Sequence, residues 1–171
     1  MNQIKPEQLN ENPFNLIGKD WMLITAEKEG RTNMMTASWG GLGVLWGKNV
    51  ATVYIRESRF TKTFIDDGDF FSLCVLGEEY RKQLVYLGKA SGRDEDKVAG
   101  SGLTVAHTDC SAGNVPYFKE SRLVLVCKKL YAQKMEADCF TKYGKDIPNQ
   151  MYADNDWHTI YVAEIEKVLI K

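Results

Sequence analysis

The segment from residue 31 to residue 64 constrains the fold of this chain more than any other. Its first part, residues 31–47, is rich in small and hydroxyl-bearing residues and carries two tryptophans, whereas Val50–Ile55 is a β-branched run. β-branched residues favour strands, and glycines within a strand mark a bend or a bulge. We therefore expect one strand over residues 33–45 with a bend near Gly40, a turn at residues 47–49, and a second strand over residues 50–55.

The polar residues of the first of these strands indicate ligand binding. Asn33, Thr36 and Ser38 can donate or accept hydrogen bonds, and their small neighbours let a ligand lie close to the backbone. The alternative is a polar strand end with one packed tryptophan. The side chain of Trp39 would then fill the core rather than lie against a ligand.

Cations and hydroxyls are concentrated directly after the second strand, at Arg56, Ser58, Arg59 and Thr61. Arginine offers a planar fork of donors to a phosphate, and serine or threonine adds short hydrogen bonds. We expect Ser58 to cap a helix that ends at Gly68, and a helix N-terminus attracts anions. The two parts of the segment together predict a site for a flat aromatic ligand with a phosphate tail. The alternative is a capped helix start with solvated arginines, in which Arg56 pairs with Glu57 or another acidic neighbour.

The rest of the chain alternates between short β-like segments and turns. We expect a helix over residues 78–86 that buries Leu84 and Leu87, and a short helix over residues 93–97. Residues 1–12 look like a loosely held lead-in with one helical turn, and we expect loops over residues 88–92, 111–115 and 139–156. The further strands are expected at residues 21–26, 69–76, 103–107, 121–135 and 157–170. Six or more strands with two short helices predict a mainly β fold, a small antiparallel β-barrel, as a single domain over residues 1–171.

Composition excludes several classes of protein. The formal net charge of −1 provides no overall positive field for nucleic acid, and no apolar run is long enough to span a bilayer. No apolar stretch follows a basic start, so we expect no signal peptide. None of the four cysteines shows Cys-x-x-Cys spacing, so no metal site is expected, and Cys74 and Cys127 look like buried thiols. These features fit a protein of the reducing cytoplasm.

The motifs resemble those of the flavin reductase-like proteins with the FMN-binding split-barrel fold, and most closely the flavoredoxin-type branch. The matching segments are Asn33–Trp39, Ile55–Thr61, Ser91–Lys97, Gly102–Thr104 and His158–Ile165, which span most of the chain in order. Many relatives have a Pro-Pro step between the two strands where this chain has Gly47-Lys-Asn49. This difference affects the loop beside the expected flavin.

The resemblance implies a six-stranded split barrel, a homodimer, and one FMN per subunit at or near the dimer interface. It places residues 33–39 along the flavin ring and residues 58–61 at the ribityl phosphate, and it makes Lys97 a candidate flavin or phosphate contact. Without the resemblance, Lys97 belongs to a solvated charged turn. The predicted cofactor-binding residues are Asn33, Met35, Thr36, Ala37, Ser38, Trp39, Arg56, Ser58, Arg59, Thr61 and Lys97.

Three functions follow from the resemblance. The first is an FMN-dependent oxidoreductase that takes electrons from NADH or NADPH; since no Gly-x-Gly-x-x-Gly follows a strand, the nicotinamide would stack directly on the flavin. The second is electron transfer with a redox-protein partner and no nicotinamide reaction. The third is a non-catalytic flavin- or haem-binding module. No catalytic side chain is predicted; His158 either faces the flavin pocket or is structural, and Lys89 is a weaker candidate than Lys97.

Overall fold

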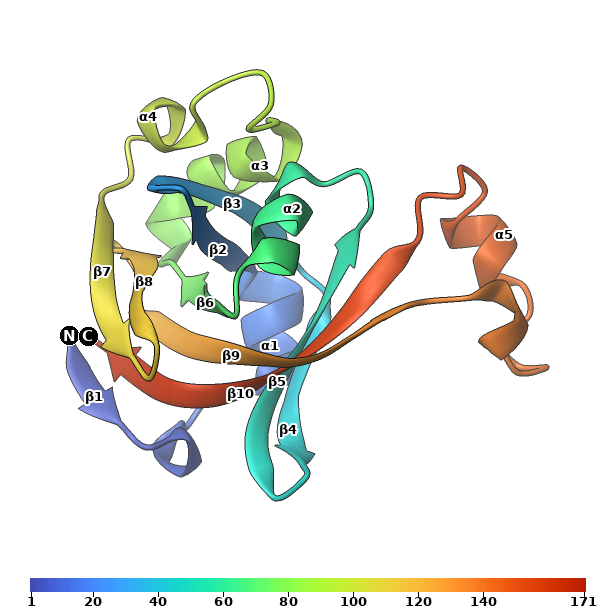
Figure 1. The fold of residues 1–171 in the computed structure, drawn as a ribbon, viewed down its shortest axis with the longest axis horizontal. Helices are drawn as coiled ribbons and strands as arrows, with labels where there is room; N and C mark the ends of the chain where they lie inside the picture. Colours follow the sequence, from blue (N-terminus) through green and yellow to red (C-terminus); the bar gives the residue numbers. More distant parts are fainter.

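An antiparallel sheet of eight strands forms the body of the protein in the computed structural model, which describes all residues from 1 to 171 (Figure 1). The strands lie in the order β3–β2–β6–β9–β10–β5–β4, and β1 also pairs with β10. Their bounds are β1 Asn2–Ile4, β2 Met22–Lys28, β3 Arg31–Ala37, β4 Gly40–Leu45, β5 Lys48–Arg56, β6 Phe70–Val75, β9 Leu123–Lys134 and β10 His158–Ile170. A separate hairpin consists of β7 Val105–Cys110 and β8 Gly113–Phe118.

Short helices occupy the connections between these strands. The α-helices are α1 Pro13–Asn15, α2 Phe60–Asp67, α3 Arg81–Lys89, α4 Lys97–Ser101 and α5 Ile147–Met151. A π-helical turn at Leu16–Asp20 follows α1, and 3₁₀ turns lie at Pro6–Gln8, Glu78–Tyr80 and Ala137–Cys139. No helix is both long enough and apolar enough to cross a bilayer.

The sheet curls around its main core because the chain joins its two edges. β3 and β4 lie at opposite ends of the strand order, yet only Ser38 and Trp39 separate them in sequence. Twenty-two buried residues fill the inside of the curled sheet, and a second cluster of twelve lies on its other face. β9 contributes to both clusters, since Leu123 and Leu125 belong to the first and Val124 and Val126 to the second. Both faces of β9 are therefore buried over residues 123–127, whereas the rest of the strand is partly or fully exposed.

Two tight hairpins connect β2 to β3 and β4 to β5. Each has two central residues with positive φ, as the type I′ turn requires: Glu29 and Gly30 at 52° and 74°, and Trp46 and Gly47 at 54° and 69°. The second turn lies one residue earlier than expected, which places a tryptophan in a conformation that favours glycine.

Five sequence-based expectations about elements were wrong. The loop expected over residues 139–156 contains the helix α5. The strand expected over residues 33–45 is two strands, broken at Ser38–Trp39. Residues 2–4 are not a loose lead-in but pair with the end of β10, and part of the loop expected at 111–115 belongs to β8. No helix forms over residues 93–97, because Asp96 caps α4 and helical structure begins only at Lys97. Short strands are fixed by their tertiary partners, and one strand's own sequence does not reveal those partners.

Candidate functional site

Three adjoining pockets open beside β3, β5 and the loop after α3. We call them the cationic pocket (about 110 Å³), the central pocket (about 360 Å³) and the apolar pocket (about 540 Å³). Arg59 lines both the cationic and the central pocket. The central and apolar pockets share Ser38, Trp39, Tyr54 and His158. The three pockets therefore form one continuous row.

The cationic pocket contains positive charge without a compensating carboxylate. Its lining residues are Asn33, Ser58, Arg59, Phe60, Thr61, Lys89, Ala90, Ser91, Gly92 and Lys97. Three of these carry cationic side chains and none is acidic. Like charges gathered in a partly enclosed space repel one another, so a bound anion would lower the energy of the arrangement.

Lys97 is the most buried of these cations, with 4% of its surface exposed. Its Nζ donates hydrogen bonds to the carbonyl oxygens of Met34 (2.6 Å) and Leu87 (2.8 Å), which holds it between β3 and α3. Burial, with a further contribution from Arg59, lowers the pKa of Lys97 to about 8. The side chain therefore stays protonated at neutral pH but lacks an anionic partner in the pocket.

Arg59 stands at the N-terminus of α2, which the protein leaves without a side-chain cap. The guanidinium donates to the carbonyl oxygen of Gly88 (2.8 Å), and burial lowers its pKa. The expectation that Ser58 caps this helix was wrong. Both the backbone N–H and the hydroxyl of Ser58 instead donate to the carboxylate of Asp156, at 2.9 Å and 2.6 Å. The first N–H groups of α2 have no partner within the helix and are therefore free for an anion.

Asn33 and Thr61 form the buried floor of the cationic pocket. The Asn33 side-chain amide donates to the hydroxyl of Thr61 at 2.9 Å. The loop after α3 packs tightly on this pair, since a Cβ at Gly92 would lie only 2.3 Å from Oδ1 of Asn33. This contact fixes how closely the loop approaches the N-terminus of α2.

The central pocket runs along β3, an edge strand that pairs only with β2. Backbone groups on the free side of an edge strand lack a strand partner and can bind a ligand. The hydroxyl of Thr36 points away from this role, because it donates to the carbonyl oxygen of Leu84 at 2.6 Å. Thr36 therefore offers mainly its backbone to the pocket.

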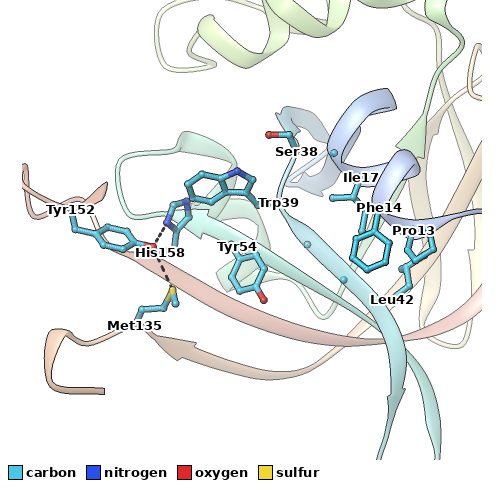
Figure 2. A pocket seen from close by; sticks show the side chains of 13 residues that line it. Pro13, Phe14, Ile17, Ser38, Trp39, Leu42, Tyr54, Met135, Tyr152 and His158 are labelled. Carbon is cyan, nitrogen blue, oxygen red and sulfur yellow. Dashed lines mark hydrogen bonds between the residues drawn. The ribbon is translucent and has the colours of Figure 1, made fainter. Parts of the chain in front are cut away.

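His158 stands where the central and apolar pockets meet, at the start of β10 (Figure 2). Its Nδ1 lies 2.9 Å from the hydroxyl of Tyr152, and its ring centroid lies 5.1 Å from that of Trp39. Burial, assisted by the nearby Arg56 cation, lowers the pKa of His158 to about 4. The imidazole is therefore neutral at pH 7.

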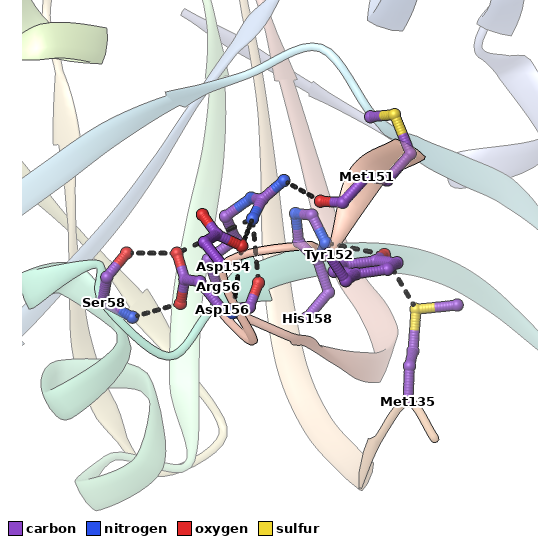
Figure 3. Close-up of polar contacts among 8 residues, drawn as sticks. All are labelled: Arg56, Ser58, Met135, Met151, Tyr152, Asp154, Asp156 and His158. Atoms are coloured by element: carbon purple, nitrogen blue, oxygen red, sulfur yellow. Dashed lines mark hydrogen bonds and ion pairs between the residues drawn. The ribbon is translucent and has the colours of Figure 1, made fainter. Parts of the chain in front are cut away.

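Arg56 anchors the segment that leads into β10 (Figure 3). Its guanidinium donates to the carbonyl oxygens of Met151 (2.8 Å) and Asp156 (2.9 Å), and it lies 3.5 Å from the carboxylate of Asp154. The alternative that Arg56 pairs with an acidic neighbour is confirmed, although Glu57 is not that neighbour and instead lies 3.5 Å from Lys62. Arg56 still borders the central pocket while holding its wall in place.

A family model for the flavin reductase like domain matches residues 15–171, nearly the whole chain. The chain belongs to the flavin reductase-like family. No curated protein sequence matches it.

Solved structures of this family show the same fold. The FMN-binding domain of a flavin reductases-like enzyme from Shewanella baltica OS155 is 18% identical, with a TM-score of 0.69 over 98% of this chain and 75% of that one. Flavoredoxin from Methanosarcina acetivorans is 21% identical, with a TM-score of 0.67 over 100% and 76%. An NADH:FAD oxidoreductase of Streptomyces globisporus C-1027, solved with NAD and FAD fragments, is 13% identical, with a TM-score of 0.63 over 89% and 74%. The fold is thus the FMN-binding split barrel of this family, as the sequence motifs predicted.

All eleven residues predicted from the motifs of this flavin reductase-like protein line the cationic or the central pocket. Their role as cofactor contacts stays a prediction. Sequence reasoning left out Tyr54, Gly88 and Met151, which also line the central pocket. Alternation along β5 could have indicated Tyr54, but no local signal marks Met151, which arrives from a distant part of the chain.

Proposed function

We propose that this flavin reductase-like protein binds FMN, with the phosphate in the cationic pocket and the ring in the central pocket. The observation that carries this proposal is the excess of positive charge at the uncapped N-terminus of α2. A ribityl phosphate is a dianion, which suits three cations and free N–H groups. The flat ring then lies along the edge strand β3, one pocket away.

The residues present fit this cofactor in defined roles. Arg59, Lys97 and the first N–H groups of α2 would hold the phosphate, while Asn33 and Thr61 shape the floor beneath it. The free backbone edge of β3 would hydrogen-bond the polar edge of the ring. The bound flavin would supply two-electron redox chemistry, and Trp39 and His158 would border the ring where the central and apolar pockets meet.

We propose that the protein acts as an oxidoreductase, with NADH or NADPH as the electron donor. The NADH:FAD oxidoreductase of Streptomyces globisporus supports this donor, because it shares the fold and was solved with NAD. The second candidate is electron transfer from a redox protein, which the flavoredoxin relatives favour. One feature of the site also favours it: no lysine or arginine lines the apolar pocket, so a nicotinamide dinucleotide entering there finds no partner for its pyrophosphate.

We also propose that the protein forms a homodimer in a reducing cytoplasm. Val44, Leu45 and Trp46 expose apolar surface at the tip of the β4–β5 hairpin, and Tyr131 of β9 packs edge-on against Trp46. Exposed apolar side chains gathered in this way suit a protein interface. All four cysteines are free thiols, which fits a reducing compartment. Sedimentation of the wild-type protein and of Trp46→Glu tests the dimer, since a charge at this tip should shift the sample toward monomer.

The decisive experiment is an absorbance spectrum of the purified protein incubated with FMN, followed by anaerobic NADH and then NADPH. Flavin bands that bleach with either nucleotide support the reductase. Bands that persist with both nucleotides but bleach with dithionite support electron transfer or, if no protein donor reduces them, a binding module. A protein that takes up no flavin refutes the proposal.

A further inference from the structure

The apolar pocket is as large as a small-molecule site but contains no formal charge. Thirteen residues line it, and none is aspartate, glutamate, lysine or arginine. The apolar and aromatic side chains at its wall are Pro13, Phe14, Ile17, Trp39, Leu42, Tyr54, Met135 and Tyr152. A volume of about 540 Å³ falls within the range of pockets that enclose a ligand of one to three rings.

Among the polar groups of the pocket, the imidazole of His158 is held in place by a hydrogen bond to Tyr152. The hydroxyl of Tyr152 can donate either to Nδ1 of His158 at 2.9 Å or to the sulfur of Met135 at 3.6 Å. A thioether is a weak acceptor, so the bond to Nδ1 is the stronger one. Since the ring is neutral, its proton then resides on Nε2. This atom has no hydrogen-bond partner in the chain and is not among the enclosed unpaired atoms, so it is an accessible donor where the apolar and central pockets meet.

We propose that the apolar pocket binds an uncharged aromatic or quinonoid carbonyl compound that exchanges electrons with the flavin, with His158 hydrogen-bonded to its carbonyl oxygen. This inference rests on the proposed function, because the two pockets share Ser38, Trp39, Tyr54 and His158 and a ligand in one would contact the ring in the other. Absence of charge selects against anionic compounds, since nothing in the pocket repays the loss of their hydration. Tyr152 is a positioning residue that fixes the tautomer of His158.

The electron balance is that of a quinone reduced by a dihydroflavin. The quinone gains two electrons and one proton as a hydride from the flavin, which is oxidised by two electrons. The resulting hydroquinone anion takes its second proton from water, while the Nε2–H group of His158 stays hydrogen-bonded to its oxygen. The donor that reduces the flavin beforehand is NADH, NADPH or a redox protein, as in the proposed function.

Binding can be tested without any turnover. Isothermal titration of 2-acetonaphthone, which has a neutral carbonyl, is compared with 2-naphthoate, which has the same skeleton and a negative charge. We expect the ketone to bind at least about tenfold more tightly, to FMN-free and FMN-loaded protein alike. Equal binding of the two probes, or no binding of the ketone, overturns the inference.

Substitutions at exposed positions give a matched pair of variants. Phe14 lines the pocket with 84% of its surface exposed, and Tyr143 is 89% exposed outside the pocket. Phe14→Lys should reverse the preference toward 2-naphthoate, whereas Tyr143→Lys and Phe14→Leu should leave it unchanged. His158→Phe should weaken 2-acetonaphthone severalfold but not 2-ethylnaphthalene, which lacks the carbonyl. If Phe14→Lys does not alter the preference, the probe binds elsewhere and the inference is overturned.

The redox step is tested with duroquinone, whose fully substituted ring does not add to thiols. FMN-loaded protein is reduced with stoichiometric dithionite without oxygen and mixed with duroquinone while the flavin bands are followed. We expect reoxidation that saturates with duroquinone and is at least about tenfold slower in Phe14→Lys. A protein that binds no FMN refutes the proposed function. A protein that binds FMN but is reoxidised without saturation, equally in all variants, refutes this inference alone.

Discussion

The cationic and apolar pockets lie at opposite ends of the same row and differ in almost every physical property. The first is small, and Arg59, Lys89 and Lys97 contribute charge to its wall. The second is about five times larger, at about 540 Å³ against 110 Å³, and has no charged wall. A charged pocket can hold one phosphate with high affinity through directed hydrogen bonds, whereas an apolar pocket discriminates by shape and by the absence of charge.

This difference suggests a division of labour within one site. Charge fixes the cofactor at one end, and the uncharged end stays open to a molecule that must enter and leave. The central pocket, with its free strand edge, connects the two.

Removing Arg59 should have the largest effect on flavin binding. Arg59→Ala deletes a charge-assisted contact to the phosphate, which is worth about 1.5–3 kcal/mol, and should therefore weaken FMN by about 10- to 100-fold. Fluorescence titration measures this effect, with riboflavin as the ligand that lacks the phosphate. Arg81→Ala, at the first residue of α3, is the matched arginine control. If riboflavin binding fell as much as FMN binding, Arg59 would support the fold of the site rather than the phosphate.

A methyl group at Gly92 should disturb the cationic pocket and leave the apolar pocket intact. In Gly92→Ala the new Cβ would lie 2.3 Å from Oδ1 of Asn33, so the loop must shift, at a cost of about 1–3 kcal/mol in the free energy of unfolding. Denaturant unfolding measures the cost. Gly43→Ala, where no atom lies within 4 Å, should change stability by no more than about 0.5 kcal/mol. If Gly92→Ala also weakened the binding of 2-acetonaphthone, the cationic and apolar pockets would not be independent of each other.

The pH dependence of FMN affinity should report on Lys97. The dianionic phosphate favours protonated Lys97, so its pKa rises above about 8 in the complex. The affinity for FMN should therefore be constant between pH 7 and 8, and it should fall as the pH rises from 8 to the pKa of Lys97 in the complex. The total fall should be about tenfold for each unit by which FMN raises this pKa. Lys97→Met should remove this fall. A wild-type affinity that does not change between pH 7 and 10 would place the phosphate away from Lys97.

Loss of Arg56 should loosen the wall of the central pocket more than it weakens FMN binding. Arg56→Ala frees the carbonyl oxygens of Met151 and Asp156, so amide hydrogen exchange in residues 147–157 should accelerate. FMN affinity should change by less than about threefold, because the guanidinium is already occupied by Asp154 and Asp156. A loss as large as that of Arg59→Ala would mean that Arg56 also binds the phosphate.

The fold class, and the part of the cationic pocket that lies next to α2, follow from the sequence alone. Cations and hydroxyls lie within a few residues of one another between Arg56 and Thr61, and neighbours in sequence at the end of a strand stay neighbours in space. The Asn33–Trp39 motif likewise lies on one strand, so its position along the central pocket followed from its order in the chain. The apolar run at the start of β9 can be seen in the sequence for the same reason, because it lies within one strand.

Only the tertiary structure decided the capping of α2, the break between β3 and β4, and the apolar pocket. Ser58 bonds Asp156, ninety-eight residues away, so no local pattern could show that it does not cap the helix. The apolar pocket draws Phe14, Leu42, Met135 and Tyr152 from four distant segments. Each of these side chains alone looks like ordinary core or surface, because contacts between segments far apart in sequence arise only when the sheet curls and brings them together.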